Sequence, residues 1–140
     1  MTVREWMKAR PIVTHPRDSI DRARSLCEEH RINQLPVVAG DRLVGIITDR
    51  DLRDAFPSIT EQERDPLRAH RETAATHVEE VMTRDVLTVN ADDALHHVAS
   101  LMQKERLNAL PVLHDGQLVG IITRNDLLRA LLALLDRASA

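Results

Sequence analysis

The sequence predicts an α/β (α+β) protein built from two tandem β-α-β-β-α units. The first observation is a repeat: shifted by 75 residues, Val3–Phe56 aligns without a gap over Val78–Leu131, and 20 of the 54 residue pairs are identical. The second is that each copy alternates helix-spaced apolar residues with short runs rich in Val and Ile. Because a 54-residue unit buries too small a share of its surface to be stable alone, the copies are expected to pack on each other with pseudo-twofold symmetry and to share a core.

The repeat also predicts the domain organisation. It assigns residues 1–56 to a first domain, 57–77 to a helical connector and 78–140 to a second domain. Each copy has a short apolar segment before its first helix, which is Ile12-Val13 in the first copy and Val86-Leu87-Thr88-Val89 in the second. These segments are expected to form the first strand of each unit.

A helix follows in each copy, with Asp18 or Asp93 as its predicted N-cap. Its inward-facing residues are spaced at i, i+3, i+6 and i+7. They are Ile20, Ala23, Leu26 and Cys27 in the first copy and Leu95, Val98, Leu101 and Met102 in the second. Cys27 is therefore expected to be a small buried hydrophobe and not a reactive thiol.

Two strands and a second helix complete each copy. The strands are joined through Gly40-Asp41 or through Asp115-Gly116, and the latter is a favourable hairpin dipeptide. The second helix begins near Asp51 or Asp126. From Asp126 to Leu135 this helix carries leucines on more than one face, so one stripe covers the core and the remainder predicts contact with a partner chain.

The connector is polar and carries one clear helix signal. Asp65-Pro66 has the residue types of an N-cap and a first helical position, which predicts a helix from about Pro66 into Val81. No structure is predicted for the segment between Pro57 and Asp65.

Composition excludes several classes of function. The only aromatic residues are Trp6 and Phe56 and the formal net charge is −3, which argues against nucleic-acid binding. The single cysteine excludes an intramolecular disulfide, and the seven histidines lack metal-ligand spacing. The longest apolar run, Ala130 to Leu135, is far shorter than the roughly 20 residues that span a bilayer. With no signal-peptide pattern at the start, a cytoplasmic protein is expected.

Three motifs occur in both copies at the same offset. They are a Leu-Pro-Val strand, the run Leu-Val-Gly-Ile-Ile-Thr-x-x-Asp-Leu, and a lead-in segment marked by Met7 or Met82. With these motifs each copy resembles a CBS domain (cystathionine-β-synthase domain), and the pair resembles a Bateman module. The chain is most similar to stand-alone bacterial CBS-pair proteins, including those of the acetoin-utilisation type.

This resemblance implies a regulatory module and not an enzyme. Such modules bind an adenine-containing ligand in the cleft between the two domains. AMP, ADP and ATP are the first candidates, with NAD and S-adenosylmethionine as further ones, and no cofactor is required. The resemblance also implies a homodimer that forms a flat four-domain disc and a protein partner that it regulates.

The candidate binding residues are Thr48 with Asp51, and Thr123 with Asp126, each at a predicted strand-to-helix junction. A Thr hydroxyl can donate to a phosphate or ribose oxygen, and a carboxylate can accept from two ribose hydroxyls. Thr-x-x-Asp before an apolar run is also a capping box, and the spacing alone favours that interpretation. The resemblance favours ribose binding by the Thr and Asp side chains, and the two roles are compatible.

The resemblance points to further candidates around these pairs. Val13 and Thr88 are expected beside the purine, and Asn33 and Asn108 precede the Leu-Pro-Val strands, where AMP-sensing relatives often carry His and Arg. Arg50 lies inside the first Thr-x-x-Asp motif. The other cations near the motifs are Lys8, Arg10, Arg84 and Arg124.

Two alternative functions stand beside the ligand sensor. A constitutive dimerisation scaffold with empty or vestigial clefts would use the surplus leucines of the last helix and would explain the missing basic pair before the strands. A small enzyme is the third, but the chain has no nucleophile elbow, no Gly-rich phosphate loop and no HExxH motif.

Overall fold

The computed structural model describes residues 1–139, and the chain folds into two compact units. Unit 1 consists of Met1–Pro11 and Leu87–Ala140, and unit 2 of Ile12–Val86. This division differs from the predicted ranges 1–56, 57–77 and 78–140. The lead-in segments are exchanged between the units. The segment with Met7 at the start of the first copy belongs to unit 1, with most of the second copy, and the segment with Met82 at the start of the second copy belongs to unit 2, with most of the first copy.

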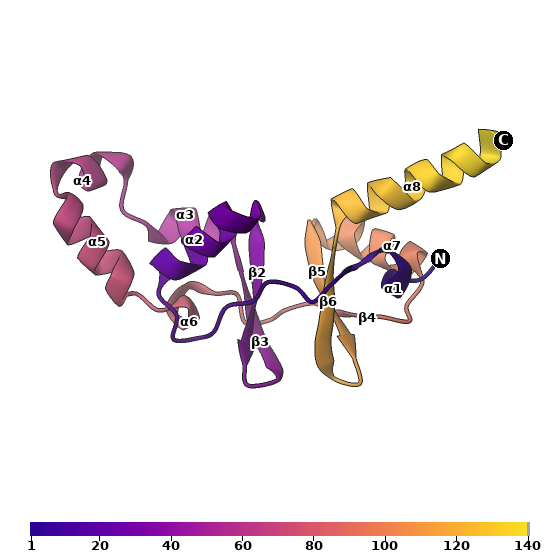
Figure 1. Ribbon diagram of the computed structural model, residues 1–140, viewed down its shortest axis with the longest axis horizontal. Coiled ribbons are helices and arrows are strands. Elements are labelled where there is room, and N and C mark those ends of the chain that lie inside the picture. Colours follow the sequence, from indigo (N-terminus) through magenta and orange to yellow (C-terminus); the bar gives the residue numbers. More distant parts are fainter. Residues whose placement is uncertain (140) are drawn as a thin grey trace. The chain divides into compact units, whose positions relative to one another are not determined.

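Unit 2 contains one β-hairpin and five helices (Figure 1). In chain order these are α2 (Ile20–His30), β2 (Gln34–Ala39), β3 (Arg42–Thr48), α3 (Asp49–Ala55), α4 (Ile59–Arg64), α5 (Pro66–Ala75) and α6 (Val78–Val81). Single bridges extend the hairpin on both sides: Thr14 pairs in parallel with Val37, and Thr83 pairs antiparallel with Ile46. The Ile12-Val13 segment therefore does not form the expected strand, and only its neighbour Thr14 makes a bridge.

Unit 1 has the same arrangement with a fuller sheet (Figure 1). Its elements are α1 (Val3–Trp6), β1 (Lys8–Ala9), β4 (Val89–Asn90), α7 (Leu95–Glu105), β5 (Ala109–His114), β6 (Gln117–Thr123) and α8 (Arg124–Ser139). The sheet order is β1-β6-β5-β4, in which β4 runs parallel to β5 and the other pairs are antiparallel. None of the helices described over residues 1–139 is both long enough and apolar enough to cross a bilayer.

The buried residues form two clusters, one in each unit. In unit 1 the cluster includes Val3, Val98, Val112 and Ile122, and in unit 2 it includes Ile20, Val37, Ile47 and Val78. Val3 and Val78 come from the exchanged lead-in segments and are fully buried. Each copy therefore completes its core with a residue of the other copy, which is how a unit this small reaches sufficient burial.

The helix faces and both hairpins predicted from the sequence are confirmed. Ile20, Ala23 and Cys27 are buried in unit 2, as are their counterparts Leu95, Val98 and Met102 in unit 1. At the second hairpin, Asp115 and Gly116 both have positive φ, of 51° and 79°, as a type I′ turn requires.

The predicted N-caps are wrong by one residue. Ser19 caps α2 and accepts a hydrogen bond from the Arg22 N–H at 3.1 Å, and Ala94 precedes α7 without a side-chain cap. Asp18 instead accepts from the Thr14 hydroxyl at 2.9 Å. Asp93 likewise accepts from the backbone N–H of Asn90 at 2.8 Å. Both aspartates therefore close the turn before the helix.

The connector contains helices α4 and α5, and the helix predicted from about Pro66 into Val81 is shorter than expected. Asp65 caps α5 and Pro66 occupies the first turn, as expected. The helix then ends at Ala75, and the chain becomes extended at Thr76 before α6 begins. The break has a physical reason, because the Thr76 carbonyl accepts from Ile20 N–H at 3.0 Å and so joins the connector to the start of α2. Helix α4 was not predicted.

Both lead-in segments run very close to a glycine of the hairpin. A Cβ placed on Gly45 would lie 2.6 Å from Met82 Sδ and 2.9 Å from the Thr83 carbonyl oxygen. A Cβ on Gly120 would lie at the same distances from Met7 Sδ and the Lys8 carbonyl oxygen. The repeated Met and Gly of the sequence motif are thus two sides of one contact, made once in each unit.

Candidate functional site

In unit 2 the Thr48 and Asp51 pair lies at the junction of β3 and α3. Thr48 N–H donates to Asp51 Oδ2 at 3.0 Å, and Asp51 N–H donates to Thr48 Oγ1 at 3.1 Å. The capping-box interpretation is therefore confirmed. Both side chains are half-buried. Within residues 1–139, Asp51 Oδ1 has neither a hydrogen bond nor an ion pair, so this oxygen can accept from a ligand.

In unit 1 the Thr123 and Asp126 pair has the same backbone geometry but a different environment. Asp126 Oδ2 accepts from the Thr123 N–H at 2.9 Å and from the Thr123 hydroxyl at 3.0 Å. Its Oδ1 lies 3.0 Å from Arg129 Nη2 and 3.4 Å from Lys8 Nζ. The Asp126 side chain is 0% exposed, so all of its partners come from the protein.

The charge state of Asp126 follows from these contacts. Burial alone would raise the pKa of this carboxyl, but the hydrogen bonds from Thr123 and Arg129 and the charge of Lys8 bring its pKa below the ordinary value of 3.8. Asp126 is therefore ionised at neutral pH. Sequence reasoning missed Arg129, although its position three residues after an aspartate on a helix is a recognisable ion-pair signal.

The structure brings Asn33 and Asn108 to the same junctions. The Asn33 carbonyl accepts from the Asp49 N–H at 2.6 Å, and the Asn108 carbonyl accepts from the Arg124 N–H at 3.0 Å. Each asparagine is exposed and adjoins the first turn of the helix that carries the aspartate. Their contact with a ligand stays a prediction.

The remaining candidates are less closely placed. Arg50 is exposed on the first turn of α3, while Val13 and Thr88 are half-buried on the segments leading to the Thr14 bridge and to β4. No hydrogen bond or ion pair with described residues holds the Arg50 side chain. It can therefore move toward or away from the Thr48 and Asp51 pair.

The other reactive groups do not form a site. Cys27 is buried in unit 2, and burial, with the nearby carboxylates of Asp49 and Glu28, raises the pKa of its thiol to about 11. The expectation that it is a buried hydrophobe is confirmed. Over residues 1–139 no group of three or more His, Cys, Asp or Glu side chains is arranged to hold a metal ion.

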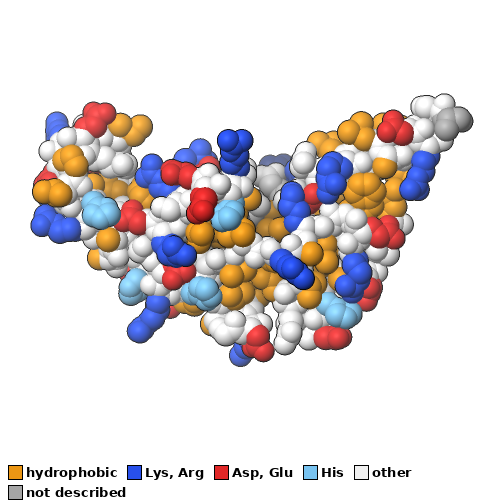
Figure 2. All heavy atoms as spheres, in the orientation of Figure 1, with side chains coloured by type: hydrophobic (Ala, Val, Ile, Leu, Met, Phe, Trp, Pro, Cys, Tyr) orange, Lys and Arg blue, Asp and Glu red, His pale blue; other side chains and the backbone are white. Residues whose placement is uncertain are grey.

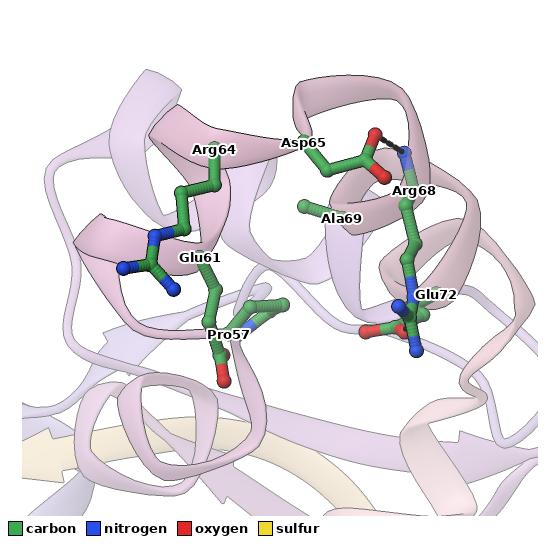
Figure 3. A pocket seen from close by; sticks show the side chains of 7 residues that line it. All are labelled: Pro57, Glu61, Arg64, Asp65, Arg68, Ala69 and Glu72. Atoms are coloured by element: carbon green, nitrogen blue, oxygen red, sulfur yellow. Dashed lines mark hydrogen bonds and ion pairs between the residues drawn. The ribbon is translucent and has the colours of Figure 1, made fainter.

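A pocket of about 240 Å³ lies between α4 and α5 (Figure 3). Its lining residues are Pro57, Glu61, Arg64, Asp65, Arg68, Ala69 and Glu72. Arg68 pairs with Glu72 at 3.2 Å, and its backbone N–H donates to Asp65. Three carboxylates and two arginines line the pocket, so it offers no excess of positive charge that would attract an anion.

Unit 1 carries an apolar groove of about 870 Å³ along α8. Its lining includes Leu95, Leu127, Leu128, Leu131 and Leu134. Five leucines of α8 are about half exposed: Leu128, Leu131, Leu132, Leu134 and Leu135. Hydrophobic side chains are visible on the surface over this helix (Figure 2). The prediction that α8 has more apolar surface than its own core covers is confirmed.

Comparisons with known proteins agree with this fold and with the repeat. The profile of the family described as CBS domain matches residues 3–58 and 78–133. A putative acetoin utilization protein (AcuB) from Vibrio cholerae has 31% sequence identity and a TM-score of 0.81, covering 99% of this chain and 96% of that one. Some curated relatives with 33 to 35% identity bear the names of enzymes, and this chain spans only 21 to 23% of their length.

Two similar structures contain ligands. CBSX2, a CBS-pair protein from Arabidopsis thaliana, was solved in complex with AMP. That structure has 30% identity and a TM-score of 0.78, covering 94% of this chain and 97% of that one. The CBS domain pair of protein MJ0100 was solved with 5-methylthioadenosine and S-adenosyl-L-methionine. It has 33% identity and a TM-score of 0.76, covering 94% of this chain and 95% of that one.

Proposed function

This chain belongs to the CBS-domain family and carries two such domains, and on that premise we propose that it is a cytoplasmic, non-enzymatic regulatory module for an adenine-containing ligand. The ligand's ribose is held by a Thr-x-x-Asp pair, of which the chain has two, Thr48 with Asp51 and Thr123 with Asp126. Its binding changes the surface that the chain presents to a partner protein. The observation that carries the proposal is Asp51 Oδ1, an acceptor beside a capped helix start that no described group of the protein uses.

The ligands of similar structures support binding through the nucleoside part of the ligand. AMP, 5-methylthioadenosine and S-adenosyl-L-methionine share adenine and a ribose with two vicinal hydroxyls, and they differ at the 5′ position. A carboxylate can accept from both hydroxyls at once. The residues before the Leu-Pro-Val strands, Asn33-Gln34 and Asn108-Ala109, carry no cation that would require a phosphate. Val13 and Thr88 are the proposed walls for the purine.

We expect wild-type protein to give saturable heat with AMP and with adenosine in a calorimetric titration. Removal of both acceptor charges in an Asp51→Asn/Asp126→Asn variant weakens binding at least tenfold, as the loss of a charge-assisted hydrogen bond does (about 1.5–3 kcal/mol). For the same reason 2′,3′-dideoxyadenosine binds at least tenfold more weakly than adenosine.

The matched control is Glu63→Gln, which removes the same charge from an exposed position on α4 and leaves binding unchanged. Circular dichroism verifies that each variant is folded at the temperature of the titration. The proposal is overturned if AMP, adenosine and S-adenosylmethionine all give no heat at millimolar concentration, or if the double variant binds as the wild type does.

The leucines of α8 favour a second candidate function, a scaffold that acts by forming homodimers. Exposed leucines on one helix rarely stay in water when they are contiguous. If α8 joins two copies, light scattering gives twice the chain mass of 15.8 kDa, and a Leu131→Arg/Leu135→Arg variant gives the monomer mass. Glu63→Arg, on exposed α4, is the control and leaves the dimer intact. Because dimer formation depends on protein concentration, a monomer mass for the wild type at about 100 μM rules this candidate out.

A further inference from the structure

The two Thr-x-x-Asp pairs are not equivalent, because only one of their carboxylates is neutralised by the protein. Asp126 makes ion pairs with Lys8 and Arg129, and its side chain is 0% exposed. Asp51 is half-buried, and no Lys, Arg or His among residues 1–139 pairs with it. A ligand would therefore meet a compensated carboxylate in unit 1 and an uncompensated one in unit 2.

The sequence repeat shows where this difference comes from. The 75-residue offset places Thr83 at the position of Lys8, and Asp54 at the position of Arg129. The backbones correspond, since Lys8 pairs with β6 in the same register in which Thr83 pairs with β3. The two units thus present the same fold and differ in the side chains that surround the aspartate.

Resting on the proposed function, we infer that Asp51 is the ribose acceptor that binds ligand at full affinity, and that Lys8 and Arg129 close the Asp126 site. A ribose hydroxyl needs an accepting lone pair, and Asp51 Oδ1 has no described partner. Both oxygens of Asp126 already accept from the protein. Ribose could use them only by separating a buried carboxylate from its cations, which is costly. The chain therefore binds one nucleoside.

Adenosine is the probe for this inference, because it lacks a phosphate that an added cation could attract. Calorimetry is expected to give one adenosine per chain. Asp51→Asn weakens binding at least tenfold, Asp126→Asn changes it less than twofold, and the control Glu63→Gln, at an exposed position on α4, leaves it unchanged.

A second experiment introduces a cation into unit 2 at the position that corresponds to Lys8. Thr83 is exposed, so Thr83→Lys is compatible with the fold and places an ammonium group where Lys8 stands in unit 1. We expect it to weaken adenosine binding at least fivefold. Thr83→Gln adds a side chain of similar length without charge and binds as the wild type does.

Each outcome distinguishes the inference from the proposed function. Two equal sites, or a loss of binding in Asp126→Asn as large as in Asp51→Asn, overturn the inference and leave nucleoside binding intact. Equal affinities of Thr83→Lys and Thr83→Gln also overturn it, and this comparison holds even if Asp126→Asn does not fold. Absence of adenosine binding by the wild type overturns both.

Discussion

Replacing Asp126 by asparagine is expected to lower the free energy of unfolding by about 2–4 kcal/mol. The substitution keeps the shape of the side chain but removes the charge with which Lys8 and Arg129 pair, and the Asp126 side chain that carries this charge is 0% exposed. An amide NH₂ in place of one carboxylate oxygen would also face a donor. Urea unfolding followed by circular dichroism measures the loss.

The matched variant Asp51→Asn is expected to lose only about 1 kcal/mol, the cost of a weakened helix cap. Equal losses in the two variants would contradict the inference that Lys8 and Arg129 neutralise Asp126 and leave Asp51 without a cation.

The pH dependence of the free energy of unfolding supplies a second readout. The pKa of Asp126 is lowered in the folded protein, so its stabilisation is fully present above the unfolded pKa of about 3.9 and is lost as pH falls through the folded pKa. The difference in the free energy of unfolding between wild type and Asp126→Asn is therefore constant from pH 5 to 8, and it becomes smaller below about pH 4.

Gly45→Ala and Gly120→Ala are each expected to destabilise the protein by about 1–3 kcal/mol through overpacking. The new methyl group would lie 2.6 Å from a Met sulfur and 2.9 Å from a backbone carbonyl oxygen. The Met side chain can rotate away, but the carbonyl cannot move without displacing the lead-in segment. Because the two sites lie in different units, the losses are expected to add in the double variant.

Hydrogen exchange tests where in unit 2 the Gly45→Ala substitution destabilises the structure. In unit 2 the Thr83 N–H donates to the Ile46 carbonyl at 2.8 Å, and the Ile46 N–H donates to the Thr83 carbonyl at 2.9 Å. Gly45→Ala should remove the protection of these two amides first. Gly40→Ala is the contrast: no atom lies within 4 Å of the added Cβ, and only the positive φ of 64° opposes it. Its cost is about 1 kcal/mol, and a smaller cost for Gly45→Ala would contradict the close approach.

The sequence was sufficient for the parts of the fold that depend on local pattern. Apolar spacing predicted the buried faces of α2 and α7, and Asp115-Gly116 predicted its hairpin. The 75-residue repeat was not sufficient to show that the lead-in segments change places. Each copy carries the same valine, Val3 or Val78, so the pattern is identical whichever core receives it.

The candidate site shows the same limit. The Thr-x-x-Asp motif predicted both the helix cap and the position of the aspartates. The asymmetry between Asp51 and Asp126 could not be predicted, because it depends on Lys8, which lies 118 residues before Asp126 in the sequence and reaches it only through the pairing of β1 with β6. Long-range ion pairs of this kind leave no periodic signal in one sequence.

The central claim is that a nucleoside is held by its ribose on a Thr-x-x-Asp pair, and a crystal structure of the protein grown with AMP tests it most directly. We expect one AMP per chain in unit 2, with a ribose hydroxyl oxygen about 2.5–3.0 Å from Asp51 Oδ1. AMP bound away from both pairs, or a ribose that contacts neither Asp51 nor Asp126, would contradict the claim.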